Sequence, residues 1–429
     1  MKGYNASRFW ERRIQWEATV DQSTIYSHQL DNGFVLVAEH MPAVSSAAFT
    51  FLLPTGAKHD PADGLGSSAV LLDLVFRGAG SRDSRQLDSF LDGLGLHREG
   101  SVATEYTSLG GALLGDNLLK ALDAYADIIR RPHLPAEQFD LSRQLVLQQL
   151  ATQEDEPRSK LMIELRKRHF PEPLGRNPLG DREHLAQLTS SGLTDFYGQS
   201  YLPGRAILAV AGNFDWPKLR EHVCSLLADW SGQPAAPPPL GSSGAKRDHL
   251  SQDTAQTQIG IAYDSVPLNH RNYYPARLAV AVLSGGMSGR LFTEVREKRG
   301  LCYHVSASHQ VLKSRGTVLC YAGTTSDRAQ QTLEVTLAEL KRLAEGIAEA
   351  ELDRAKIGLK ANLIMLGEST AARSGSAAAD VYHLGRVRSL DEISAAIDAV
   401  SVSDLLNHLR EFPPADFTIL TLGNKQLEA

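Results

Sequence analysis

The sequence predicts an α+β protein of two homologous α/β sandwich halves, each a mostly antiparallel sheet with helices packed on one face. Three observations indicate this class. At 429 residues the chain is too long for one hydrophobic core. A run rich in Pro, Gly and Ser divides it into parts of similar size, and strand-like and helical segments follow the same order in both parts. We therefore expect an N-terminal domain at 1–230, a linker at 231–248 and a C-terminal domain at 249–429.

Strands are predicted where apolar and β-branched residues cluster between turn signals. In the first half these segments are 33–40, 47–54 and 205–214. In the second half they are 258–266, 316–323 and 416–424. Each half therefore reads as strands, a helix, further strands, paired helices and a closing strand.

The paired helices carry apolar stripes at the spacing of one helical face. In the first half the stripes are Leu118, Leu122, Tyr125 and Ile129, then Phe139, Ser142, Val146 and Leu150. In the second half they are Leu333, Leu337, Leu340 and Ala344, then Leu352, Ala355, Leu359 and Leu363. Leu352 follows Phe139 by 213 positions. Amphipathic helices all share this period, so chance is an alternative, but the matching order of elements favours an internal duplication.

Composition excludes several functional classes. The net charge of −6 gives no reason to expect nucleic acid or anionic lipid as a partner. Three widely separated cysteines without a CxxC motif fit a reducing compartment and argue against a cysteine zinc site. The N-terminus lacks the apolar region of a secretory signal, and no window approaches about 18 apolar residues. We expect a cytoplasmic protein without a membrane span.

One predicted helix, in the stretch GLGSSAVLLDLVFRGAG from Gly64 to Gly80, is apolar on every side. Such helices are normally buried. Asp73 is the charge in its middle. Positions 69, 72 and 73 lie on one helical face at the spacing of H-x-x-E-H, in which two histidines bind zinc and the glutamate is the general base.

An ordered set of motifs resembles the pitrilysin/insulinase family of inverted zincin metallopeptidases, especially its two-domain processing-peptidase-like members. The matching segments are QLDNGFVLVAEHMP, TGAKHDPADGLG, FRGAGSR, the block from Pro173 to Asp215, and LSGGMSGRLFTEVREKRGLCYHVSAS. The resemblance covers nearly the whole chain. It implies a fold of the processing-peptidase/LuxS-like metallohydrolase type.

The same resemblance implies a degenerate metal site. The family's first histidine falls on Ala69, its glutamate on Leu72, its second histidine on Asp73 and its third ligand on Gln149. Ala and Leu offer zinc no lone pair, and Leu72 cannot take a proton from water. We therefore expect no metal and no cofactor in this chain. Asp73 is predicted to be a hydrogen-bonded or partly solvated acid, with a residual ion ligand as the alternative.

The second half resembles the family domain that carries an R-x-x-x-x-x-x-Y pattern, here Arg296 and Tyr303. The local sequence predicts a helix through Arg296, a C-cap at Gly300 and a strand that begins near Tyr303. The implied role is electrostatic: Arg296 anchors a substrate carbonyl, and Tyr303 donates to an oxyanion. The alternative is that Arg296 pairs with Glu294 or Glu297, and that Tyr303 serves only in packing.

The family also implies a substrate strand added to a sheet edge, which matches the segment from Gly100 to Gly111. The residues assigned to substrate binding are Ser101, Val102, Ala103 and Thr104. An ordinary edge strand is the alternative. His304 and His309 belong to no ligand grouping and are predicted to lie at the surface or to pack.

The leading interpretation is a non-catalytic, zinc-free subunit of a heterodimeric zinc peptidase. Its implied partners are a zinc-bearing paralogous subunit and an unfolded or extended peptide, and Arg296 and Tyr303 would assist the partner's catalysis within a peptide-degrading or processing chamber. One alternative is a scaffold or peptide-binding module with no role in proteolysis. A second alternative is a self-sufficient metallopeptidase.

Overall fold

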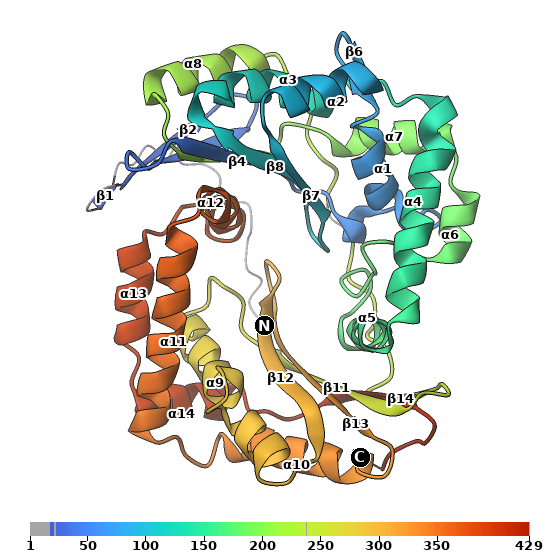
Figure 1. The fold of residues 1–429 in the computed structure, drawn as a ribbon, viewed down its shortest axis with the longest axis vertical. Helices are drawn as coiled ribbons and strands as arrows, with labels where there is room; N and C mark the ends of the chain where they lie inside the picture. Colours follow the sequence, from blue (N-terminus) through green and yellow to red (C-terminus); the bar gives the residue numbers. More distant parts are fainter. Residues whose placement is uncertain (1–17, 21–22, 237, 429) are drawn as a thin grey trace. The chain divides into compact units, whose positions relative to one another are not determined.

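The computed structural model describes residues 18–20, 23–236 and 238–428 of the chain. They form two compact units (Figure 1). Unit 1 comprises the described residues of 1–150, 178–238 and 366–389, and unit 2 comprises those of 151–177, 239–365 and 390–429. Each unit therefore combines segments from both halves of the sequence.

Unit 1 is built on a seven-stranded sheet in the order β1-β2-β3-β9-β4-β8-β7. Its strands are β1 (Ala18–Val20), β2 (Ser23–Gln29), β3 (Val35–His40), β4 (Ser46–Leu53), β7 (His97–Val102), β8 (Thr107–Leu114) and β9 (Ile207–Gly212). β3 and β9 pair in parallel, whereas the other neighbours are antiparallel. A short hairpin of β5 (Gly78–Ala79) and β6 (Arg82–Asp83) lies outside this sheet. β7 is an edge strand.

Helices cover one face of this sheet and enclose the main core of unit 1. They are α1 (Ser67–Leu74), α2 (Ser84–Gly93), α3 (Leu118–Arg130), α4 (Ala136–Asp155), α6 (Arg182–Gln187), α7 (Ser190–Ser200) and α8 (Trp216–Leu227), with 3-10 turns η2 (Ala57–His59) and η3 (Gly115–Asn117). Aromatic rings centre the core: Tyr125 of α3 packs edge-on against Phe49 of β4 at 4.7 Å between ring centroids. The Tyr125 hydroxyl donates to the Gly110 carbonyl at 2.8 Å, so this buried polar group is satisfied.

A helix from far along the chain covers the second face of the unit 1 sheet (Figure 1). α12 (Thr370–Leu384) packs Ala377, Ala378 and Val381 against apolar side chains of the sheet. Its Arg373 makes a buried ion pair with Glu39 of β3, Nη2 to Oε2 at 2.6 Å. Apolar contact and a charge pair thus fix this helix to the sheet.

Unit 2 has a five-stranded sheet in the order β10-β14-β11-β13-β12. Its strands are β10 (Arg247–Ser251), β11 (Gln256–Ser265), β12 (Cys302–Val311), β13 (Gly316–Thr325) and β14 (Thr418–Gly423). β10 and β14 are parallel, and the remaining pairs are antiparallel. The helical elements are α9 (Tyr273–Ser284), η4 (Phe292–Glu297), α10 (Ala329–Arg342), α11 (Glu349–Gly367), α13 (Leu390–Asp398) and α14 (Val402–Glu411). They enclose a second apolar core.

The other face of the unit 2 sheet is covered by α5 (Pro157–His169), a helix from the first half of the sequence. Leu161 and Leu165 of α5 pack among Ala262, Leu319 and other buried residues of the sheet. The His169 ring at the end of α5 lies 3.0 Å, Nδ1 to Oγ1, from Thr418 of β14. α5 therefore closes unit 2 as α12 closes unit 1.

The structure confirms the α+β class and the two halves of mixed sheet and helices. The compact units differ from the contiguous division at 1–230 and 249–429, because α5 and α12 each pack in the unit built mainly from the other half. No helix or strand lies in the described residues between α8 and β10, which include most of the predicted linker. Among the described helices, none combines the length and apolar composition that a membrane crossing requires.

Candidate functional site

Three of the four positions predicted to form a degenerate metal site lie on α1, whose first turn is bound by Asp60. Gly66 precedes α1 with a φ of +96°, which a side chain would strain. The Asp60 carboxylate accepts from the backbone N–H groups of Gly66 at 2.8 Å and Ser68 at 3.0 Å. Because this acid satisfies N–H groups at the helix start, α1 is buried without unpaired donors there.

Two of the positions carry only hydrocarbon. Ala69 is 8 % exposed and belongs to the core of unit 1. Leu72 is partly buried against that core, and its methyl groups lie beside Gly100 of β7, where a Cβ would meet them at 3.4 Å. Neither side chain can ligate a metal or accept a proton.

The third position, Asp73, is already paired. Its Oδ2 accepts from Arg77 Nε at 3.0 Å and from Arg77 Nη2 at 2.9 Å. The buried hydroxyl of Ser142 on α4 donates to the same oxygen at 2.5 Å. A guanidinium four positions on, just past the end of α1, thus supplies the positive charge that balances this carboxylate.

The fourth position, Gln149 on α4, is exposed and carries a neutral amide. Within the part of the chain that the structure describes, no three His, Cys, Asp or Glu side chains are grouped so as to hold a metal ion. Catalytic zinc takes three protein ligands, usually imidazoles or carboxylates. The residues at positions 69, 72, 73 and 149 therefore do not fit zinc.

The residues assigned to substrate binding lie at and beyond the end of β7. Ser101 and Val102 are on the strand, which pairs with β8 on one side only in the described sheet. Ala103 and Thr104 follow the strand, and their carbonyls accept from Ala57 and from Lys58 at 3.0 and 2.9 Å. The free edge is therefore in His97–Val102, whereas two of the four predicted residues already use their carbonyls within unit 1.

The structure brings Arg296 and Tyr303 together in unit 2. The Arg296 guanidinium carbon lies 5.0 Å from the centroid of the Tyr303 ring and 4.6 Å from that of Phe292. Tyr303 is 80 % exposed. Among the described residues, no carboxylate lies within ion-pair distance of Arg296, so its predicted alternative partners, Glu294 and Glu297, are not bound to it.

Arg296 and Tyr303 each lie at an irregularity of the backbone. Arg296 belongs to η4, a π-helix in which Lys298 N–H bonds to the Thr293 carbonyl five residues back, at 2.9 Å. The register between β12 and β13 shifts between Cys302 and His304, so Tyr303 is the extra residue of a β-bulge. π-helices and bulges often occur at functional sites, where they redirect side chains.

Gly300, predicted as the C-cap, has a φ of +59° and donates to the Arg296 carbonyl at 3.0 Å. The helix itself ends earlier than predicted, at Glu297 with Lys298 as its C-cap, and Gly300 lies two residues beyond that cap. The left-handed conformation turns the chain from η4 toward β12. The turn separates Arg296 from Tyr303 by only a short segment of backbone.

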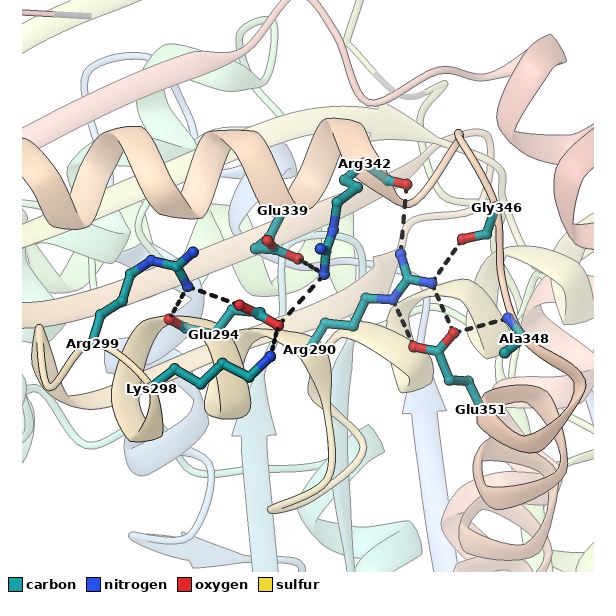
Figure 2. A network of polar contacts seen from close by, with 9 residues as sticks. All are labelled: Arg290, Glu294, Lys298, Arg299, Glu339, Arg342, Gly346, Ala348 and Glu351. Carbon is teal, nitrogen blue, oxygen red and sulfur yellow. Dashed lines mark hydrogen bonds and ion pairs between the residues drawn. The ribbon is translucent and has the colours of Figure 1, made fainter.

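The acid expected to compete for Arg296 is bound elsewhere. Glu294 Oε1 lies 2.7 Å from Lys298 Nζ, and its Oε2 lies 2.8 Å from Arg299 Nη1 (Figure 2). Arg342 of α10 approaches at 3.7 Å. The wider turn of a π-helix brings residues four and five positions on to the same side as Glu294. Hydrogen bonds from Lys298 and Arg299 lower the pKa of Glu294 to about 2.

The ion pairs of Glu294 with Lys298 and Arg299 form one charged clamp on η4. A second charged clamp holds the residues before η4. Arg290 forms a two-pronged ion pair with Glu351 of α11, Nε to Oε1 at 2.7 Å and Nη2 to Oε2 at 2.8 Å (Figure 2). It also donates to the Gly346 carbonyl at 2.7 Å. Together the two clamps tie the segment that carries Arg296 to the loop and helices behind it.

Three groups of contacts made by these residues were not predicted from the sequence. Ser142 stands alone as a polar residue in the apolar stripe of α4, a signal that a buried donor needs a partner. Arg77 lies four positions after Asp73, the spacing of a helical ion pair. No feature of the amino-acid sequence indicated that Lys298 and Arg299 bind Glu294, because this arrangement depends on the π-helix.

Family models match both halves of the chain. The model described as insulinase (peptidase family M16) matches residues 35–181, which include α1 and α4. The model described as peptidase M16 inactive domain matches residues 187–359, which include Arg296 and Tyr303.

Curated relatives match along most of this chain and most of their own length. An uncharacterized zinc protease of Rickettsia felis is 27% identical over 402 residues, which cover 93% of this chain and 97% of that protein. The uncharacterized zinc protease YmxG of Bacillus subtilis is 26% identical, with coverages of 93% and 98%.

Solved structures show the same fold. A peptidase M16 inactive domain from Pseudomonas fluorescens superposes with a TM-score of 0.86 at 19% identity, covering 94% of this chain and 99% of that chain. A protease from Helicobacter pylori gives 0.85 at 20% identity, with coverages of 94% and 100%. Sequence models for both halves, relatives along most of the chain and two matching folds agree, and the chain belongs to the insulinase (pitrilysin, M16) family of peptidases.

Proposed function

We propose that this chain is the zinc-free, non-catalytic subunit of a two-subunit peptidase. It would bind an unfolded or extended peptide and lend Arg296 and Tyr303 to the active site of a zinc-bearing paralogous subunit. The observation that carries the proposal is the exposed Tyr303 ring beside an arginine with no carboxylate partner among the described residues. The three free cysteines favour a reducing, cytoplasmic setting for the pair.

The chemistry assigned to these residues is electrostatic. The Tyr303 hydroxyl donates a hydrogen bond to the oxygen of the scissile carbonyl as negative charge develops on it. The Arg296 guanidinium holds a neighbouring carbonyl and fixes the register of the peptide. A preorganised donor of this kind contributes about 3–4 kcal/mol to the reaction barrier. Bond cleavage itself belongs to the partner, because positions 69, 72, 73 and 149 of this chain do not fit zinc.

The edge strand β7 supports peptide binding. An extended peptide can add to a free sheet edge through backbone hydrogen bonds, which tolerate many sequences. Ser101 and Val102 lie on this edge and remain the proposed contacts. The Ala103 N–H already donates to the Tyr106 carbonyl at 2.8 Å, so the proposed backbone pairing is with the strand rather than with Ala103.

The experiment compares the purified pair with each subunit alone. The partner is the family member from the same organism that keeps H-x-x-E-H. We expect the pair to cleave an unfolded peptide faster than the partner alone, and Arg296→Ala or Tyr303→Phe to lower kcat by about 10²-fold or more. Arg354→Ala, an exposed arginine on α11, is the matched control and should leave cleavage unchanged.

Each alternative has its own result. If the partner alone cleaves as fast as the pair, the subunit role is wrong. If the pair is needed but neither substitution changes cleavage, the chain acts as a scaffold. Stoichiometric zinc in the isolated chain, together with turnover, would show a self-sufficient metallopeptidase.

A further inference from the structure

Cationic and aromatic side chains alternate along one part of unit 2. The Arg158 guanidinium of α5 lies 4.6 Å from the centroid of the Tyr321 ring. The His304 ring lies 5.7 Å from the same tyrosine. His304 adjoins Tyr303 in the β12 bulge, and Tyr303 contacts Arg296. The row Arg158–Tyr321–His304–Tyr303–Arg296 therefore extends the proposed site beyond Arg296 and Tyr303.

The positive charges of this row are not balanced by ion pairs. Among the described residues, neither Arg158 nor Arg296 has a carboxylate within ion-pair distance. The arginines of the neighbouring clamps, Arg290, Arg299 and Arg342, all have one. Desolvation, followed by the charges of Arg158 and Arg296, lowers the pKa of His304.

The acid nearest to Arg158 in sequence is used by the helix. Glu156 is the N-cap of α5 and accepts from the backbone N–H groups of Arg158 at 3.2 Å and Ser159 at 2.5 Å. Backbone donors thus engage its carboxylate. The Arg158 side chain is left exposed over the Tyr321 ring.

A guanidinium stacked on a ring keeps its N–H edges available. Stacking uses the flat face of the group, whereas a carboxylate binds in its plane through two parallel hydrogen bonds. The Tyr321 hydroxyl is bound to Gln258 at 2.5 Å, which fixes the ring on which Arg158 lies. Tyr321, His304 and Tyr303 lie between the two arginines of the row, and none of them repels an anion as a carboxylate would.

We propose that Arg158 and His304, next to Arg296, form a subsite that binds a carboxylate of the substrate peptide. This inference rests on the proposed function, because it assigns a chemical class to the peptide bound there. The carboxylate has two sources, the C-terminus of the peptide or an acidic side chain. Arg158 would bind it in a bidentate manner, and His304 would donate one hydrogen bond.

The test measures binding of rhodamine-labelled 12-residue Gly/Ser/Ala/Val peptides to the isolated full chain by fluorescence anisotropy. One peptide has a free C-terminus, one a C-terminal amide, and one an amide with a single internal Glu. A charged hydrogen-bonded contact is worth about tenfold in affinity. We expect one or both carboxylate peptides to bind about tenfold more tightly than the neutral amide, with an advantage that shrinks as salt increases.

Substitutions then assign the effect. Arg158→Gln should abolish the carboxylate advantage without weakening the neutral peptide, and Arg158→Lys should keep only part of it. Arg166→Gln is the matched control, because Arg166 is also on α5 and also stacked, on Phe170 at 5.0 Å. It should leave the advantage intact.

The outcomes separate this inference from the proposed function. Equal binding of all three peptides, or an advantage that survives Arg158→Gln, overturns the carboxylate subsite and leaves peptide binding in place. Failure of every peptide to bind overturns peptide binding and the subsite together. Preference for the free C-terminus alone assigns the terminal carboxylate, and preference for the internal Glu assigns an acidic side chain.

Discussion

The guanidinium of Arg296 lies over the ring of Tyr303, 5.0 Å from its centroid, and the two residues meet across a turn that ends at Gly300. Because Tyr303 is 80 % exposed, this contact adds little to stability. We expect Arg296→Ala and Tyr303→Phe each to change the free energy of unfolding by less than about 1 kcal/mol. Urea denaturation of the isolated chain measures this. A loss above about 2 kcal/mol in either variant would mean that lost cleavage reports unfolding rather than chemistry.

Glu294 should be a major contributor to the stability of unit 2. Hydrogen bonds from Lys298 and Arg299 lower its pKa from 4.5 to about 2, a difference equivalent to about 3 kcal/mol. A lowered carboxylate pKa stabilises the fold above pH 4.5, and that contribution is lost as pH falls toward 2. We expect Glu294→Gln to lower the free energy of unfolding at pH 7 and to flatten its fall between pH 4.5 and 3.

The control for this prediction is Glu297→Gln, which neutralises an exposed acid three positions away in the same helix. It should change stability by no more than about 0.5 kcal/mol. Equal effects of the two substitutions would contradict a special role for the clamp in Figure 2.

The buried His408 and the partly buried His309 should make unit 2 sensitive to mild acid. Burial, followed by the charge of Arg277, lowers the pKa of His309 to about 4, and burial with nearby His270 lowers that of His408 to about 4. The unfolded chain takes up these protons first, near pH 6.5. Stability is therefore full above pH 6.5 and falls as pH drops toward 4, by about 2 kcal/mol per histidine between pH 7 and 5.

The measurement is urea denaturation at pH 7 and pH 5 for the natural chain and His309→Gln. The substitution should remove about half of the pH-dependent loss attributed to the two groups. His304→Gln is the comparison, because His304 is exposed. An identical pH dependence in all three proteins would rule out this origin.

The buried pair Arg373–Glu39 should be costly to break from one side. Their side chains are 5 % and 4 % exposed, so removal of one partner leaves an uncompensated charge inside unit 1. We expect Arg373→Met to lower the free energy of unfolding by about 3–5 kcal/mol, and the double variant Arg373→Met, Glu39→Met to cost less. If the double variant is the less stable of the two, the pair itself stabilises α12.

Much of the fold follows from residue patterns. The all-apolar helix around Val70 and Leu71 is buried as predicted. Gly300 adopts the left-handed conformation, although the helix before it ends at Glu297. The stripes of α3, α10 and the first turns of α4 and α11 lie in the predicted cores. These features depend on local sequence, which the 3.6-residue period reports well.

What the patterns could not predict depends on tertiary partners. An apolar stripe shows which face of a helix is buried but not against which sheet, so the placement of α5 and α12 had no local signal. The π-helix at Arg296 and the bulge at Tyr303 each arise from a single extra residue, which neither helical nor strand periodicity encodes. Ser142 could have been matched to Asp73 only with α1 and α4 in place.

The placement of α5 and α12 has a consequence for how the polypeptide can be divided. A cut in the segment near Pro238 would yield two fragments. The first would lack α12, which covers its sheet, and would carry α5, which covers the sheet of the second. Neither fragment should fold well alone, yet a nicked molecule should stay associated, because each piece remains threaded into its neighbour's architecture. The two halves of the chain thus form a reciprocal assembly rather than a tandem of independent modules.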